Sequence, residues 1–159
     1  MLGIAILMST SFWPIAETHL EWRQKDRHSY FLATRLHGKD NEGQPLFLQQ
    51  QAAESFGELQ EAALKAGWDI QVNYAYRSHR QQARLHRRAP NWAAKPGYST
   101  HEQGISVDIA GTSIKKCRRC SRQSTDLHRW LLENGANYGF VNDVPKEPWH
   151  FTYVPDKKD

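Results

Sequence analysis

The chain has 159 residues, of which 39% are hydrophobic and 24% charged, a composition that suits one folded domain and excludes a disordered chain. The net charge of +4 indicates a mildly basic surface, which favours an anionic partner. Aromatic residues are not interleaved with the two basic runs, RSHRQQARLHRR and KKCRRC, so we expect no nucleic acid among the partners.

The first 16 residues are apolar but too short to cross a bilayer, so no stable membrane span is expected. This stretch has no basic residue before its apolar centre, and Pro14 suits a signal-peptide cleavage site poorly. We therefore expect residues 1–45 to be an N-terminal segment that packs on the domain, or a partial leader. Residues 46–159 are expected to form the functional domain.

Two helices are predicted in the first half of the chain. Residues 17–37 place Leu20, Phe31 and Leu36 among charges in a moderately helical pattern. A loop rich in Gly, Asn and Pro follows. Residues 48–67 then carry an apolar stripe and end at Gly67, as a helix does. The stripe consists of Ala52, Phe56, Leu59 and Ala63.

A strand, a helix and a second strand are predicted next. Residues 68–76 alternate apolar and polar side chains, which is typical of a strand with one apolar face. Ser78 and Gln81 form a capping-box pattern that opens a basic helix to about Arg88. A loop rich in Pro and Gly follows, as a possible cleft wall. Residues 105–109 predict a strand with apolar residues on one face and Asp108 on the other.

The last third of the chain predicts a helix and a final strand. A Ser or Thr cap opens a helix over residues 124–135, which ends near Gly135, and residues 148–155 are predicted as a strand between prolines.

Cys117 and Cys120 precede the helix. A single pair cannot make a four-cysteine zinc site, so we expect a short disulfide or two free thiols instead of a redox role. Helices first, and then strands separated by helices, predict a compact α+β domain.

Asp108 raises the question of what a carboxylate on a half-buried strand would bind. Catalytic zinc takes three His or carboxylate ligands and leaves a fourth position for water. His101, Asp108 and His150 would supply such a set, and Glu147 would remain as a general base near the water. Pro148 fixes the backbone between base and ligand. Three further histidines lie among charges on helical stretches and are expected at the surface, namely His79, His86 and His128.

The motifs SxHxxGxxxD, from Ser99 to Asp108, and EPWH, from Glu147 to His150, resemble those of the zinc D-alanyl-D-alanine carboxypeptidases of the VanY type. These enzymes belong to the LAS metallopeptidases. The run YRSHRQQ is similar to the upstream element of that family, an Arg-Ser followed by a Gln five positions after the Arg. The matches run from about residue 48 to 154. Ser106 departs from the alanine that the family usually has two residues before the aspartate.

The resemblance implies a LAS/Hedgehog-type zinc peptidase fold, a small antiparallel sheet with helices packed on it, in residues 46–159. It implies one Zn²⁺ ion held by His101, Asp108 and His150, although such sites also accept other divalent ions. Glu147 would be the general base. Arg77 would polarise the scissile carbonyl or hold the developing oxyanion. The residues implied to contact the substrate are Gln82, Ser99 and Trp149.

The implied function is that of a metallopeptidase that cleaves peptidoglycan stem peptides, first of all a D-alanyl-D-alanine carboxypeptidase. An endolysin-like L-alanyl-D-glutamate endopeptidase and a non-catalytic zinc-containing binding domain are the alternatives. Because Glu147 and Arg77 are both present, an enzyme is favoured over a binding domain. We expect a monomer in the cell envelope or periplasm, or secreted, and a cytoplasmic protein if the chain is phage-derived.

Overall fold

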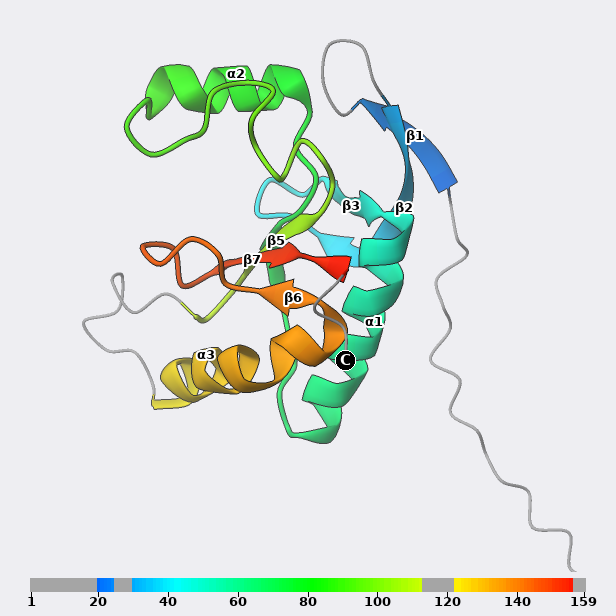
Figure 1. Cartoon of the computed structure of the whole chain (residues 1–159), viewed down its shortest axis with the longest axis vertical. Helices are drawn as coiled ribbons and strands as arrows, with labels where there is room; N and C mark the ends of the chain where they lie inside the picture. Colours follow the sequence, from blue (N-terminus) through cyan, green and yellow to red (C-terminus); the bar gives the residue numbers. More distant parts are fainter. Residues whose placement is uncertain (1–19, 25–29, 113–121, 156–159) are drawn as a thin grey trace, which may run out of the picture.

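The structure, a computed structural model, describes residues 20–24, 30–112 and 122–155. The predicted leader and both cysteines, Cys117 and Cys120, lie outside these ranges. The described elements form two antiparallel sheets, one of three strands and one of four, with helices packed beside them (Figure 1). The predicted α+β class is confirmed.

The three-stranded sheet contains β1 (Leu20–Gln24), β2 (Tyr30–Lys39) and β3 (Pro45–Gln49), in that order and antiparallel throughout. The helix predicted over residues 17–37 is therefore wrong for the part that the structure describes. The sheet also joins both sides of the predicted division at residue 45, because β3 pairs with β2.

An irregularity in β2 explains why this stretch has a helical pattern. Phe31 and Ala33 are buried in the alternation of a strand, but the pairing register shifts between Arg35 and Lys39. Arg35, at the start of the shifted stretch, is exposed, and Leu36 within it is buried. From Arg35 to Lys39, β2 has two residues more than the stretch of β3 that it faces, so the buried side chains are unevenly spaced and their pattern in the sequence resembles that of a helix.

Helix α1 (Gln50–Lys65) follows β3 directly and contacts β2 and β3. All four residues of the predicted stripe are buried, and Gly67 follows the helix end with a φ of +87°. The predicted helix is confirmed. Its phenylalanine, Phe56, meets Phe140 edge to face with ring centroids 5.4 Å apart. This contact belongs to the main hydrophobic core, to which α1 and strands of both sheets contribute.

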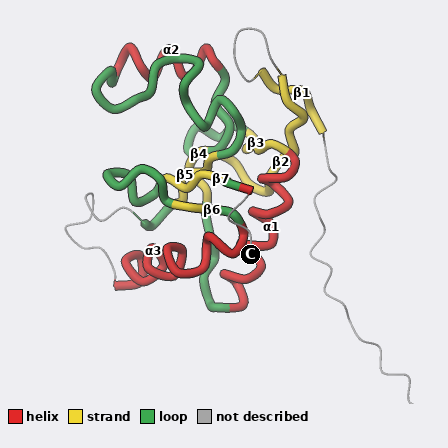
Figure 2. The backbone as a smooth tube through the Cα atoms, viewed as in Figure 1, coloured by secondary structure: helices red, strands yellow, loops and turns green. Residues whose placement is uncertain are grey.

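The four-stranded sheet has the order β4-β5-β7-β6. It is built from β4 (Val72–Tyr74), β5 (Ser106–Ile109), β7 (His150–Tyr153) and β6 (Phe140–Val141), and it lies at the centre of the molecule in Figure 2. Strand β4 is shorter than the predicted stretch 68–76. On β5 and β7, alternate residues such as Val107 and Phe151 enter the core. The other face therefore carries Asp108 and His150.

Two more helices flank this sheet. Helix α2 (His79–Arg88) starts after Ser78, whose side chain and that of Gln81 form the predicted capping box. Helix α3 (Arg122–Asn134) starts before the predicted Ser or Thr cap, which lies inside the helix, and it ends at the 3₁₀ turn η2 (Gly135–Tyr138). None of the described helices has the length and apolarity that a membrane crossing requires.

Gly104 joins the two sheets at a point where no side chain fits. Its φ is +70°, and a Cβ would lie 2.3 Å from Cζ of Phe31 and 3.1 Å from the backbone nitrogen of Gln49. We expect Gly104→Ala to lower the free energy of unfolding by about 3 kcal/mol, from backbone strain and overpacking together. Gly43→Ala is the matched control, since its φ of +78° is similar but nothing lies within 4 Å of its Cβ position. Equal losses in urea titrations of the two variants would refute the steric account.

Candidate active site

The three predicted metal ligands meet on one face of the four-stranded sheet. Asp108 on β5 lies directly opposite His150 on β7, and His101 lies in the turn before β5. Oδ1 of Asp108 lies 3.1 Å from Nδ1 of His150 and 3.3 Å from Nε2 of His101. The two imidazole nitrogens are 3.2 Å apart. All three residues are buried.

This triangle of donor atoms has the dimensions of a zinc site. A tetrahedral zinc ion with ligands about 2.0–2.1 Å away holds those ligands roughly 3.3–3.4 Å apart. The three separations, from 3.1 to 3.3 Å, are close to this value. Two imidazoles and one carboxylate also match the donor types that zinc takes in catalytic sites. The residues present therefore fit the ion that the resemblance implies.

The tautomer of His101 is fixed by the main chain. Nδ1 of His101 lies 2.7 Å from the carbonyl oxygen of Ala75, which can only accept a hydrogen bond. One ring proton is therefore on Nδ1, which leaves Nε2 as the nitrogen that would bind a metal beside Asp108 and His150. This is the orientation that a metal ligand needs.

Asp108 sits in a field that favours its ionised form. Burial alone would raise the pKa of this carboxyl, but the charges and hydrogen bonds of His101 and His150 hold the pKa well below its usual range. A carboxylate that stays ionised is ready to bind a cation. The site thus answers the question of why an acid lies on this half-buried strand.

Glu147 lies in the turn that leads into β7, within electrostatic range of the triangle. Its backbone nitrogen donates to the carbonyl of Val144 at 2.8 Å, and its carbonyl accepts from the backbone nitrogen of His150 at 3.0 Å. The side-chain amide of Asn142 donates to the same carbonyl at 2.8 Å. Partial burial raises the pKa of the Glu147 carboxyl above its ordinary value, against the opposing charge of His150. Glu147 therefore takes up a proton more readily than an ordinary carboxylate does.

Arg77 is a largely buried cation on the same side. Desolvation lowers its pKa, and the negative charges of Asp108, Glu102 and Glu147 oppose this effect. Its Nη1 donates to Oε1 of Gln82 at 2.8 Å. The amide nitrogen of Gln82 donates in turn to the carbonyl of Ala94 at 2.7 Å. This chain of bonds holds the guanidinium in one place, as a group that stabilises a transition state must be held.

The predicted substrate contacts differ in exposure. Gln82 is 1% exposed and Ser99 6% exposed, whereas Trp149 is half-buried. Both polar groups of the Gln82 side chain bind protein atoms, so the structure places this residue behind Arg77. Contact of these three residues with substrate stays a prediction.

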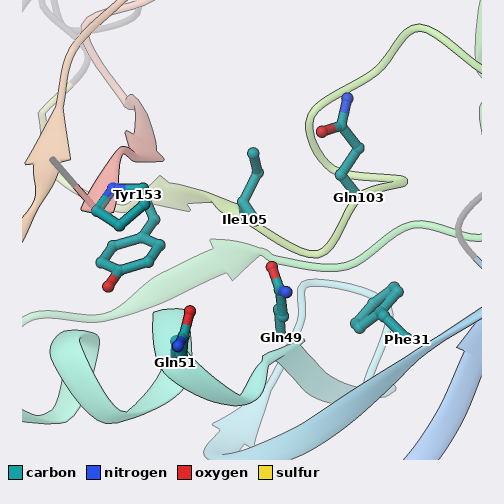
Figure 3. A pocket seen from close by; sticks show the side chains of 7 residues that line it. Phe31, Gln49, Gln51, Gln103, Ile105 and Tyr153 are labelled. Carbon is teal, nitrogen blue, oxygen red and sulfur yellow. The ribbon is translucent and has the colours of Figure 1, made fainter.

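A separate pocket of about 420 Å³ lies elsewhere (Figure 3). Ile105 and Tyr153 line it together with three glutamines, Gln49, Gln51 and Gln103. By the alternation of β5 and β7, Ile105 and Tyr153 lie on the opposite side of the sheet from Asp108 and His150. None of the predicted site residues lines this pocket.

A hydrogen bond between Glu102 and His79, next to the ligands, was not predicted. Glu102 is fully buried, with Oε1 2.9 Å from Nδ1 of His79 and Oε2 accepting from the backbone nitrogen of Gly97 at 2.8 Å. This pair ties the first turn of α2 to the loop that carries His101. The expected surface position of His79 is therefore wrong.

The other two histidines that were expected at the surface are also half-buried. Nδ1 of His86 lies 2.8 Å from the carbonyl oxygen of Ala93. The ring of His128 packs edge to face on Phe151, with centroids 6.4 Å apart. The charged residues beside them in the sequence concealed these contacts.

We expect His79→Ala to lower the free energy of unfolding by about 2 kcal/mol, because the variant leaves the Glu102 carboxylate buried with one partner fewer. Chemical denaturation of the zinc-free protein measures this loss. His37→Ala serves as the control, since His37 is exposed on β2, and we expect a change within about 0.5 kcal/mol there. A loss at His79 no larger than that at His37 would show that the pair contributes nothing to stability.

Comparison with known proteins bears out the resemblance. The family model of VanY, described as D-alanyl-D-alanine carboxypeptidase, matches residues 45–156. A D-alanyl-D-alanine carboxypeptidase of Enterococcus faecium is 30% identical over 121 residues, which cover 69% of this chain and 38% of that protein. The putative carboxypeptidase YodJ of Bacillus subtilis (strain 168) is 29% identical over 133 residues, 72% of this chain and 49% of that protein. The chain thus spans less than half the length of these relatives.

Solved structures share the fold. A mutant of the vancomycin resistance D,D-pentapeptidase VanY in complex with Zn(II) is 22% identical, with a TM-score of 0.58 over 87% of this chain and 80% of that one. VanYB in complex with D-alanine-D-alanine is 24% identical, with a TM-score of 0.57 at the same coverage. The LD-carboxypeptidase LdcB gives a TM-score of 0.57 at 24% identity, over 77% of this chain and 66% of that one. With the family model matching residues 45–156, the chain belongs to the VanY family of D-alanyl-D-alanine carboxypeptidases.

Proposed function

We propose that the protein is a zinc-dependent peptidase that removes the terminal D-alanine from peptidoglycan stem peptides. The observation that carries the proposal is the triangle of His101, Asp108 and His150, with donor atoms 3.1–3.3 Å apart. Glu147, a carboxyl with a raised pKa, and Arg77, a half-buried cation, lie within electrostatic range of this triangle. A structural metal site would need neither of these two groups.

Each residue has a distinct part in the proposed reaction. Zinc, when bound by the three ligands, polarises a carbonyl and lowers the pKa of a water molecule. Glu147 takes the proton of the attacking water and returns it to the leaving amine. Arg77, fixed by Gln82, stabilises the negative charge that develops on the carbonyl oxygen. The hydrogen bond between His79 and Glu102 holds the loop of His101 against the first turn of α2.

The choice of substrate rests on relatives and on charge. The Enterococcus faecium relative is a D-alanyl-D-alanine carboxypeptidase, and the VanYB structure contains D-alanine-D-alanine. Helix α2, which begins next to Arg77, exposes four further arginines to solvent: Arg80, Arg84, Arg87 and Arg88. An anionic polymer such as the bacterial cell wall suits this surface. We accordingly place the protein in the cell envelope, the periplasm or outside the cell, or in the cytoplasm if it is phage-derived.

A panel of defined muropeptides tests the proposal. The purified protein is incubated with stem peptides that end in D-Ala-D-Ala and with shorter ones that end in a single D-Ala, and the products are identified by mass spectrometry. Loss of one D-Ala from the first group alone is the expected result. Cleavage between L-Ala and D-Glu would assign the endopeptidase alternative. Zinc binding without cleavage of any peptide would favour the non-catalytic binding domain.

A further inference from the structure

A chain of hydrogen-bonding side chains lies behind His150, on the side away from Asp108. Nε2 of His150 is 3.1 Å from Oγ1 of Thr152, and that hydroxyl donates to Oδ1 of Asp143 at 2.8 Å. Oγ of Ser106 lies 2.9 Å from the same hydroxyl. Ser106 is fully buried and Thr152 is 4% exposed, so solvent has little access to compete for these bonds. The chain reaches the surface at Asp143, whose side chain is 40% exposed.

The directions of these hydrogen bonds follow from counting protons. The carboxylate of Asp143 can only accept, so the single hydroxyl proton of Thr152 is directed to it. The Thr152 oxygen is then left to accept, from the Ser106 hydroxyl and from Nε2–H of His150. Nε2 of His150 therefore carries a proton, which leaves Nδ1 as the nitrogen that would bind a metal beside Asp108 and His101.

The two histidines are thus oriented in different ways. His101 donates to a backbone carbonyl, which no side-chain substitution can remove. The orientation of the His150 ring depends on side chains, and these lie at defined positions on two paired strands of the sheet. Thr152 is two residues from His150 on the same face of β7, and Ser106 is the cross-strand partner of Thr152 on β5.

We propose that Thr152 and Asp143 act as a positioning relay for His150, and that this relay sets the affinity of the site for zinc. The proposal rests on the proposed function only in that it takes His101, Asp108 and His150 as the metal ligands. A partner that fixes the tautomer and raises the basicity of a ligating histidine typically contributes 10- to 100-fold to metal affinity. Asp143, through Thr152, would supply both effects.

The zinc dissociation constant of the full chain, measured by competition with a chelator of known affinity, tests the relay. Thr152→Val keeps the shape of the side chain and removes its hydroxyl, and we expect it to weaken zinc binding by about 10- to 100-fold. Asp143→Ala should weaken binding by about 10-fold. Thr152→Ser retains the hydroxyl and should stay within about twofold of the wild type. His150→Ala identifies the site, because it should remove the binding that is being measured.

Asp126→Ala is the matched control for charge. Asp126 has a side-chain exposure of 35%, similar to that of Asp143, and pairs with Arg129 on α3, away from the relay. We expect no change in zinc affinity there. Equal weakening in Asp126→Ala, or Thr152→Val binding as tightly as the wild type, would overturn the proposal. The latter result would mean that the ring is oriented by Thr100, whose hydroxyl lies 3.4 Å from Nε2, or directly by Asp143, whose Oδ1 lies 3.7 Å from Nε2.

A spectroscopic measurement separates positioning from damage to the fold. In the zinc-loaded protein, the Nε2 proton of His150 should have the downfield ¹H shift of a hydrogen-bonded ring proton in the wild type and in Thr152→Ser, and should lose that shift in Thr152→Val. An unchanged shift in a Thr152→Val variant that melts like the wild type would also overturn the relay. Neither measurement needs a substrate, so failure of the proposed peptidase activity would leave this test intact.

Discussion

Glu147→Gln is expected to lower kcat for release of D-alanine by about 10⁴-fold, while the protein still binds one zinc ion. The amide of the variant cannot accept the proton of the attacking water. Product release from a D-Ala-D-Ala stem peptide, followed by mass spectrometry at saturating substrate, measures the effect.

The same substitution should stabilise the zinc-free protein. A carboxyl whose pKa is raised by burial favours the folded state when protonated and disfavours it when ionised, so the ionised Glu147 costs stability at neutral pH. We expect Glu147→Gln to raise Tm by about 1–2 °C at pH 7, a small shift because the group is only partly buried. This gain should vanish as the pH falls below the ordinary carboxyl pKa. A lower Tm together with lost zinc would mean that Glu147 is a structural group.

Arg77→Ala is expected to lower kcat/KM by about 10³-fold, the loss typical of removing a fixed group that stabilises an oxyanion. Arg77→Lys should recover little of this activity, since a lysine cannot reproduce the planar guanidinium that Gln82 holds at 2.8 Å. Initial rates on the same stem peptide over a range of concentrations separate kcat from KM.

Arg80→Ala is the control for this prediction. Arg80 carries the same charge about one helical turn away on α2, but it is exposed to solvent. A substitution there removes one positive charge without touching the cleft, so we expect less than a threefold change. If the two variants lose activity equally, Arg77 contributes only to the general field of the basic helix.

Local sequence patterns predicted the elements whose residues pack in a regular period. The stripe of Ala52, Phe56, Leu59 and Ala63 is a full helical face, and all of α1 follows from it. The capping box of Ser78 and Gln81 is likewise a local interaction, and the structure contains it as expected. Residues 17–37 were misassigned because a bulge in β2 shifts the alternation, and such a bulge depends on the pairing with β3.

The metal ligands of the candidate site could be predicted from the sequence, but the residues that hydrogen-bond to them and to their loop could not. Motif spacing pointed to His101, Asp108 and His150, and the fold brings these three together across β5 and β7. The hydrogen bond between His79 and Glu102 joins residues 23 positions apart, which no local pattern reveals. Thr152 could have been suspected, since it lies two residues after a ligand on the same strand face. Asp143 could not, because only the approach of the preceding loop brings it there.

Zinc dependence is tested by measuring zinc content and D-alanine release on the same preparation, before chelation, after chelation and after zinc is returned. We expect one zinc ion per chain, loss of D-alanine release when the ion is removed, and recovery when it is restored. His150→Ala should lack both the ion and the activity. Release of D-alanine that continues at full rate in a preparation free of metal would contradict the central claim.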